Sequence, residues 1–435
     1  MKILFLSGHY PPNAKGGGEI STHLIARGLI ERGHEVVVIT EAQKHEETTL
    51  DGVRVIRLPV SLTAKVLFEK QASWRIAKAL GKDIETIISS YSHPGMQPRE
   101  PWVVHAHDWR STLVLYELLT YTSSHTRCVE TGVCKQIIVV TTRDYAQLSG
   151  DTNYICADGS IPDQPGTIMA ELRSPRIREA TGFQKIGRAT QYLLNVGYRR
   201  RAFQALPFQI FISHVQRNEI LRHQNIPENR TAVIYNPVAP EYVATPVADT
   251  HSENILYAGR IEFYKGVGLL LKAWTSVARD FPRARLTLVG AGAQKAGYQE
   301  EVKKLGLSDR TTFVDHTAIE NMLETYDQAS IVVAPHLWIE PFGRTVVEGM
   351  ARGRIVVAAD AGGPAEIISH MKTGLLFERR SAVDLQNVLT TALTFPSDTR
   401  QVIGQAAREW VTKNLSIGVI AQQYENIYNK ALVEV

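Results

Sequence analysis

Short apolar runs alternate with longer amphipathic segments in the first half of the chain. The apolar runs predict buried strands at 3–7, 36–40, 53–58, 102–106 and 136–141. The segments 19–32 and 62–80 repeat their apolar residues at helical spacing, which places Trp74 on a buried helix face. Strands that alternate with helices indicate parallel sheets covered by helices. This half of the sequence therefore predicts an α/β fold.

The same alternation continues to the end of the chain. Further strands are predicted at 208–213, 231–235, 254–259, 285–290, 331–335, 355–359 and 374–377, and further helices at 267–279, 343–351 and 417–432. A polar stretch at 240–252 contains Pro246 and has the composition of a linker. Because 435 residues exceed one ordinary core, we expect one domain at 1–240 and a second at 241–415.

Composition narrows the classes of partner. The chain has 48 basic and 44 acidic residues, and a net charge of +4 argues against nucleic acid as a main partner. Three cysteines, at 128, 134 and 156, follow no zinc-binding spacing and suggest free thiols in a reducing, cytoplasmic compartment. The first apolar run is too short for a signal peptide, and no apolar run is long enough to span a membrane.

The richest chemistry lies between residues 336 and 353. A predicted strand is followed by Glu340, then by Pro341 where a helix could begin, and then by a helix that carries Glu348 about one turn inside. The start of a helix offers unpaired N–H groups and a partial positive charge to a phosphate. Two carboxylates beside such a site suit a molecule with phosphate in the middle and sugars at both ends. The expected lining residues are Phe342, Gly343, Arg344 and Thr345.

Three other loops follow predicted strands at the edge where parallel sheets bind ligands. Arg260 and Lys265 place two cations on one loop, suited to a diphosphate. His107 ends the strand in Trp102–Trp109, and its neutral ring could hydrogen-bond a sugar hydroxyl. His105 is expected on the opposite face, in a structural role. Backbone N–H groups can approach an anion closely at the consecutive glycines Gly16, Gly17 and Gly18.

Together these motifs resemble the retaining nucleotide-sugar glycosyltransferases of family 4. The resemblance rests on EPFGRTVVEGMARG, on Gly-Arg-x4-Lys-Gly at 259–266, on HAHDW at 105–109 and on the glycine loop. It implies the GT-B fold, with two Rossmann-like domains facing across a cleft and a C-terminal helix at 416–435 that crosses back to the first. It implies that Arg260 and Lys265 bind the donor diphosphate, and that Glu340, Glu348 and His107 contact its sugars. Family analogy adds base contacts at His316 and Thr317.

The resemblance also implies a mechanism. Retention is expected through same-face attack, in which the departing phosphate takes the proton of the acceptor. The sequence has no Asp-x-Asp, and the side-chain cations can offset the charge of the leaving group, so we expect no metal and no other cofactor.

Some features depart from the family or allow other interpretations. Arg143 stands where the family often has histidine, and the Gly-Gly-x-x-Glu turn that ends at Glu366 is interpreted as structural. The basic segment 173–201 is either a solvated helix face or a contact for an acidic, lipid-linked or membrane partner. Lys15 before the glycines and HAHDW also fit a glycogen-synthase-like glucosyltransferase. A non-catalytic nucleotide-sugar-binding module is the alternative of another class.

Overall fold

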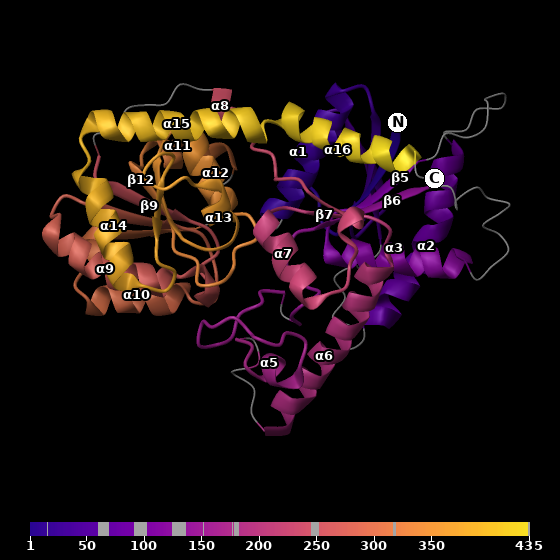
Figure 1. Ribbon diagram of the computed structural model, residues 1–435, viewed down its shortest axis with the longest axis horizontal. Coiled ribbons are helices and arrows are strands. Elements are labelled where there is room, and N and C mark those ends of the chain that lie inside the picture. Colours follow the sequence, from indigo (N-terminus) through magenta and orange to yellow (C-terminus); the bar gives the residue numbers. More distant parts are fainter. Residues whose placement is uncertain are drawn as a thin grey trace.

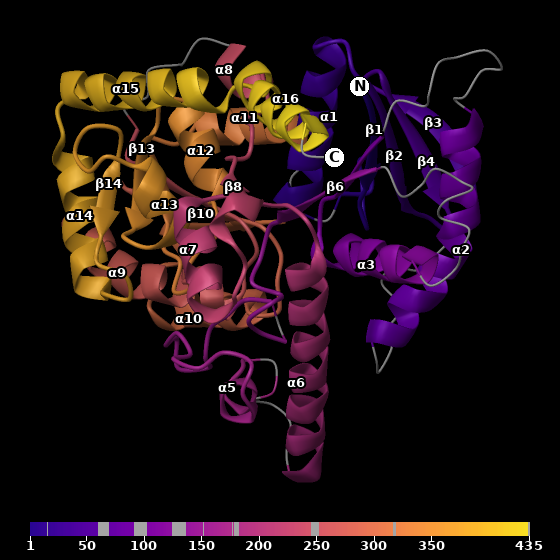
Figure 2. The same ribbon diagram turned by 45° about the vertical axis from the view of Figure 1, so that its right-hand side comes forward.

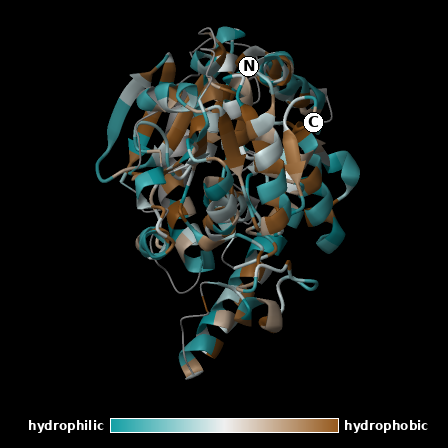
Figure 3. Cartoon of the chain, turned by 90° about the vertical axis from the view of Figure 1, so that its left-hand side faces the viewer, coloured by the Kyte–Doolittle hydropathy of each residue, from teal (hydrophilic) through white to brown (hydrophobic). Residues whose placement is uncertain are grey.

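The computed structural model describes residues 1–433, apart from 15, 60–68, 91–101, 124–135, 151, 176, 178–181, 245–251 and 316–318. Its strands form two separate sheets, each sandwiched by helices (Figure 1). The strands are its most apolar parts and lie inside, beneath helices with polar outer faces (Figure 3). The two domains and their α/β class follow the alternation of apolar and amphipathic segments.

The first sheet has eight strands in the order β3-β4-β2-β1-β5-β6-β7-β8. All neighbours are parallel except β3 and β4, which form an antiparallel hairpin. The strands are β1 (Lys2–Leu6), β2 (Glu35–Glu41), β3 (Glu46–Leu50), β4 (Val53–Leu58), β5 (Val103–Ala106), β6 (Ile137–Thr142), β7 (Gln209–Phe211) and β8 (Thr231–Val233). Its helices are α1 (Gly17–Glu31), α2 (Glu69–Ser90), α3 (Trp109–Ser123), α5 (Ile168–Leu172), α6 (Gly182–Ala205) and α7 (His214–His223). The short helix α8 (Glu241–Ala244) follows and packs on the second domain (Figure 1).

The second sheet has six parallel strands in the order β11-β10-β9-β12-β13-β14. They are β9 (Asn254–Ala258), β10 (Arg285–Val289), β11 (Thr311–Val314), β12 (Ile331–Ala334), β13 (Ile355–Ala359) and β14 (Leu375–Phe377). Its helices are α9 (Val267–Asp280), α10 (Lys295–Lys304), α11 (Ile319–Asp327), α12 (Arg344–Ala351), α13 (Gly362–Ile367), α14 (Ala382–Thr394) and α15 (Ser397–Leu415). The strand order runs outward in opposite directions from β9 and β12, so the switch point of the sheet lies between these two strands. Open α/β sheets bind ligands at this point.

The last helix, α16 (Ile417–Val433), leaves the second domain and lies on the first (Figure 1). Tyr428 Oη lies 2.7 Å from Nδ1 of His105, inside the first sheet's core. Gly28 of α1 lets this helix approach, because a Cβ there would lie 2.5 Å from the Ile417 side chain. The chain end therefore joins the two domains by packing as well as by covalent connection.

Among the elements of the first domain, one local prediction is wrong and one strand is absent from the predictions. Trp74 on α2 is 43% exposed, and the ammonium of Lys78 lies over its ring instead of a buried apolar neighbour. β3 is absent from the predicted strands because its sequence, Glu46–Leu50, is polar and its residues are mostly exposed. Strand β3 lies at the edge of the sheet and needs little apolar surface, so hydrophobic pattern alone does not reveal it.

Candidate active site

The stretch 336–353 forms a loop and a helix at the carboxyl end of β12. Helix α12 begins at Arg344, three residues after Pro341, so the proline does not start it. Gly343 precedes the helix with φ of 87°, a left-handed conformation that favours glycine. The loop is held from behind by the turn at Gly363, whose N–H donates to the carbonyl oxygen of Glu340 over 2.8 Å. The conformation of Gly343 thus turns the chain from the carboxylate loop into α12.

Glu340 is a buried carboxylate whose contacts all gather on one oxygen. Oε2 accepts from Nζ of Lys265 at 2.6 Å and from Nε1 of Trp338 at 3.0 Å, and Nε2 of His336 lies 3.1 Å away. Burial acts to raise the pKa of Glu340, but Lys265 and His336 act against it, and the net effect lowers the pKa to about 2. Burial also lowers the pKa of His336 to about 4, so this ring donates as a neutral imidazole.

The other oxygen, Oε1 of Glu340, accepts no hydrogen bond from the described residues. An ionised carboxylate can accept several hydrogen bonds. Glu340 is therefore a fixed, charged acceptor with one oxygen available to a hydroxyl.

The second predicted cation has a different environment. Arg260 is exposed at the end of β9, and the structure's described part gives it no ion pair. Its guanidinium lies 5.7 Å from the ring centre of Tyr264, which also lies beneath Lys265. Arg260 and Lys265 therefore share one loop, with Lys265 held by Glu340 and Arg260 open to an anion.

Glu348 is held by two groups on neighbouring elements. Oε1 accepts from Nη2 of Arg344 at 2.9 Å, and Oε2 accepts from the hydroxyl of Tyr326 at 2.8 Å. Burial raises the pKa of Tyr326 well above its usual range, so this hydroxyl stays protonated and remains a donor. Each oxygen of Glu348 can accept a further bond, so the carboxylate can still receive a ribose hydroxyl.

Arg344 joins the second domain to the glycine loop of the first. Its Nη1 donates to Oγ of Ser21 in α1 over 3.1 Å, while its other nitrogens stay with Glu348. A Cβ on Gly17 would lie 2.2 Å from Cδ of Arg344. A larger residue at position 17 would therefore have to displace the arginine that approaches from the other domain. Gly16 precedes α1 in an extended conformation that any residue adopts.

The remaining predicted donor residues have simpler settings. Phe342 is buried against Tyr235 of the first domain, with ring centres 6.1 Å apart. The hydroxyl of Thr345 donates to the carbonyl oxygen of Ala258, which ties α12 to the end of β9. His316 and Thr317 lie outside the described residues.

His107 is buried at the tip of β5, and its surroundings correct one prediction. The ring of His105 stacks on it at 4.0 Å, so His105 is on the same face and not the opposite one. Residues two apart on a strand point the same way, and the prediction ignored this period. Burial lowers the pKa of His107 well below its usual range, with His105 and Arg143 adding to the effect. A ring whose pKa is this far lowered is neutral at pH 7.

Glu366 joins the second domain to the first through hydrogen bonds that the sequence analysis did not predict. Its carboxylate accepts from the backbone N–H groups of His214 and Val215, at the start of α7 in the first domain. It also accepts from the hydroxyl of Tyr235 over 2.8 Å. The Gly-Gly-x-x-Glu motif was the available signal, but its partner is 152 residues away in sequence. Glu366 thus joins the two domains beside Phe342.

An aromatic cluster forms another contact between the domains. Trp338, from the Glu340 loop, packs edge-on against Tyr264 and against Tyr145 of the first domain, at 5.2 and 6.3 Å between ring centres. Burial raises the pKa of Asp144, next to Tyr145, to about 6. The cluster places the end of β6 beside the carboxylate loop.

The basic segment 173–201 separates into paired and projecting cations. Arg199 is buried, where it pairs with Glu69 and lies over the ring of Trp109. Helix α6 projects away from both sheets (Figure 2), and its outer part carries Lys185, Arg188 and the exposed Phe183.

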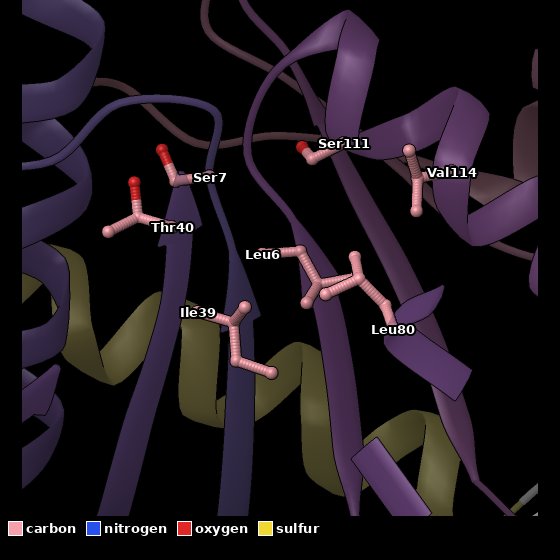
Figure 4. Close-up of a pocket in the computed structure, with 7 residues that line it drawn as sticks. All are labelled: Leu6, Ser7, Ile39, Thr40, Leu80, Ser111 and Val114. Atoms are coloured by element: carbon pink, nitrogen blue, oxygen red, sulfur yellow. The ribbon is translucent and has the colours of Figure 1, made fainter. Parts of the chain in front are cut away.

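A small cavity in the first domain is too small for a substrate. It lies beside the ends of β1 and β2 and has a volume of about 10 Å³, room for about one water molecule (Figure 4). Its lining consists of Leu6, Ser7, Ile39, Thr40, Leu80, Ser111 and Val114. Among the described residues there is no group of three or more His, Cys, Asp or Glu arranged to hold a metal ion. Nor does that part of the chain contain a helix with the length and apolarity needed to cross a membrane.

Two family models match the chain, one on each domain. The family described as "Glycosyl transferases group 1" matches residues 240–410, and "Glycosyltransferase Family 4" matches residues 15–149. An uncharacterized glycosyltransferase from Methanocaldococcus jannaschii is 24% identical, over 99% of both chains. Glycogen synthase from Mycobacterium tuberculosis is 23% identical, over 98% of this chain and 94% of that protein.

Solved structures with the same fold cover the whole chain. Sucrose-phosphate synthase from Thermosynechococcus elongatus has a TM-score of 0.73 at 20% identity, covering 100% of both chains. The Anabaena protein HepE, in complex with UDP-glucose, has a TM-score of 0.65 at 18% identity, covering 99% of this chain and 100% of that one. The two parallel-sheet domains have the GT-B fold, as predicted.

Proposed function

Because the chain belongs to the group 1 glycosyltransferases, we propose that it moves a sugar from a nucleoside-diphosphate sugar to an acceptor hydroxyl with retention of configuration. The observation that carries the proposal is the arrangement around α12. Glu340 with Lys265 lies before this helix, Glu348 with Arg344 lies on it, and Arg260 faces solvent beside them. A diphosphate with a sugar at each end fits such alternating cations and carboxylates. The complex of HepE with UDP-glucose supports the same class of donor.

Stabilisation of the leaving group is assigned to Arg260 and Lys265. Charge grows on the diphosphate as the bond to the sugar breaks, and fixed cations nearby stabilise that charge without reorganising. Arg260 can bind two phosphate oxygens at once, whereas Lys265 acts as a point charge. Glu340 holds Lys265 in place and offers Oε1 to a sugar hydroxyl. Glu348 binds the ribose, and Arg344 leaves or shares that carboxylate when the donor enters.

Retention is proposed through same-face attack. Glu340 is ionised but already engaged on Oε2 by Lys265 and Trp338, which suits an orienting group better than a nucleophile. In this mechanism the departing phosphate takes the proton of the attacking hydroxyl, so no side chain has to act as a base. His107, with its lowered pKa, donates a hydrogen bond to the donor.

Transfer is also proposed to be independent of metal. The positive charges of Arg260 and Lys265, together with the N–H groups at the start of α12, take the place that a divalent ion would have. Activity that is unchanged by EDTA would agree with this. Activity that disappears with EDTA and returns with Mg²⁺ or Mn²⁺ would contradict it.

A glycogen-synthase-like activity is the second candidate, since the full-length relative from Mycobacterium tuberculosis carries that name. Incubation with glycogen and either ADP-glucose or UDP-glucose separates the candidates, because only a glycogen-synthase-like enzyme extends glycogen. Slow hydrolysis of the donor without acceptor separates both enzymes from a non-catalytic binding module.

A thermal-shift screen of nucleoside diphosphates and their sugars tests the donor class. A ligand at a hundred times its dissociation constant adds about 2.7 kcal/mol to the free energy of unfolding. We expect one nucleoside diphosphate sugar to raise the melting temperature of the wild type but not that of the Arg260→Ala/Lys265→Ala variant. Equal stabilisation of the two proteins would contradict the assignment of the cations.

Contact with an acidic or lipid-linked acceptor through 173–201 stays a prediction. It depends on the projecting part of α6, where Lys185 and Arg188 accompany Phe183, which is 93% exposed. Co-sedimentation with vesicles of phosphatidylglycerol, compared with Phe183→Ser, measures this contact directly.

A further inference from the structure

Arg143 occupies the tip of β6 and directs two donors at one histidine. Its Nε donates to the carbonyl oxygen of His107 over 3.0 Å, and its Nη2 lies 3.2 Å from Nδ1 of the same residue. Nη1 donates to Oδ1 of Asn236, and Nη2 has a longer contact of 3.4 Å with Oγ1 of Thr22. Gly18 lies close above, where a Cβ would be 3.2 Å from Cδ of Arg143. The guanidinium is therefore fixed by groups from three parts of the first domain: the tip of β5, helix α1 and the loop at Asn236.

This geometry determines the proton on the imidazole. A guanidinium has donors and no acceptor, so Nδ1 of His107 must accept and cannot carry a proton. The ring is neutral because it is buried and lies between Arg143 and His105. The single ring proton is then on Nε2. That atom is buried and has no hydrogen-bond partner among the described residues.

We propose that Arg143 is a positioning residue that holds His107 in the Nε2–H tautomer, so that His107 donates a hydrogen bond to an oxygen of the bound donor. The identity of that oxygen rests on the proposed function, but the tautomer does not. A buried N–H without a partner is uncommon in proteins, and a ligand oxygen would satisfy it. Other charged groups near Arg143 are Glu19, Asp108 and Arg344, and in the described part of the chain none of the three hydrogen-bonds to the His107 ring.

The assignment excludes one role for His107. Nδ1 is occupied by a donor and Nε2 already carries its proton, so the ring cannot take the proton of the acceptor hydroxyl. The arginine suits this purpose because its planar fork serves the carbonyl and the ring together. A histidine in its place would have at most two ring nitrogens for the same contacts.

Long-range ¹H–¹⁵N correlation spectra of the full chain, labelled on its 14 histidines, report the tautomer. His107→Gln identifies the resonances of His107. We expect the Nε2–H pattern in the wild type at pH 7. We expect the same pattern in Thr22→Val, which removes the 3.4 Å contact with Arg143 and the hydrogen bond of Thr22 to the carbonyl oxygen of Gly18 but leaves the contacts of Arg143 with His107. We expect a shift toward Nδ1–H in Arg143→Met. An Nδ1–H or doubly protonated His107 in the wild type overturns the proposal, as does an unchanged tautomer in Arg143→Met.

Kinetics separate this inference from the proposed function. Loss of one oriented hydrogen bond predicts a fall in kcat/KM of roughly three- to tenfold in Arg143→Met. The double variant with His107→Gln should lose little more than His107→Gln alone. Fully additive losses overturn the link between the two residues. A chain that transfers no sugar from any donor contradicts the proposed function, while the wild-type spectrum still decides the tautomer.

Discussion

Glu340→Gln tests the carboxylate at the centre of the proposed site. The change keeps the shape of the side chain and removes the charge that pairs with Nζ of Lys265 at 2.6 Å. The pKa of Glu340 falls from 4.5 to about 2 in the fold, and a difference of that size corresponds to about 3 kcal/mol at neutral pH. A loss of this size lowers the melting temperature of a domain of this length by roughly 6 to 12 °C.

The effect on transfer should exceed the effect on stability. Loss of a charge-assisted contact in the transition state costs about 3–4 kcal/mol, so kcat should fall by roughly 10²–10³. Initial rates with the donor found by thermal shift, measured well below the lowered melting temperature, give kcat for both proteins.

A matched control is Glu219→Gln. Glu219 is also a buried carboxylate, bonded to the hydroxyl of Tyr154 and to Arg222, but it lies on α7 of the first domain and bonds none of the groups that hold Glu340. We expect the control to lose stability and to keep kcat within about threefold. If folded Glu340→Gln also transfers sugar within threefold of the wild type, the role assigned to Glu340 is refuted.

Three further predictions concern the interface, the last helix and pH. Gly17→Ala should impair transfer, and it should cost much less in an Arg344→Ala background, because the clash at 2.2 Å is with that side chain; equal costs in both backgrounds, measured by initial rates, would show that the contact is absent in solution. Tyr428→Phe removes the hydroxyl paired with buried His105 and should lower the free energy of unfolding by about 1–3 kcal/mol in urea titrations, whereas an unchanged midpoint would contradict the docking of α16. The stabilisation from Glu340 is complete above pH 4.5 and is lost as pH falls toward 2, so the wild type should lose about 3 kcal/mol more than Glu340→Gln over that window; parallel acid profiles would argue against the lowered pKa.

The sequence predicted the elements well wherever apolar residues were concentrated. The pattern located β12 and β13 because these parallel strands are buried, and therefore apolar, on both faces. It also located the helix after Gly343. The pattern failed for the polar edge strand β3 and for the exposed Trp74, where little or no core surface is involved. It also failed for His105, through an error of strand periodicity.

Partners in the site could not be read from the sequence. Lys265 and Glu340 are 75 residues apart, yet share a hydrogen bond of 2.6 Å. Arg344 was expected only to line a phosphate site, and its contact with Ser21 depends on how the two domains meet. Arg143 appeared as a departure from the family, and its contacts with His107 emerge only once β5 and β6 lie side by side. Long-range pairing follows from the tertiary fold and leaves no local pattern.

The anomeric configuration of the product, determined by ¹H NMR in the presence of EDTA, tests the central claim most directly. An α-linked nucleotide sugar should yield an α-linked product, formed at the same rate with or without the chelator. A β-linked product would contradict retention. Transfer that resumes only on addition of Mg²⁺ would contradict the proposal that Arg260 and Lys265 stabilise the charge of the leaving diphosphate.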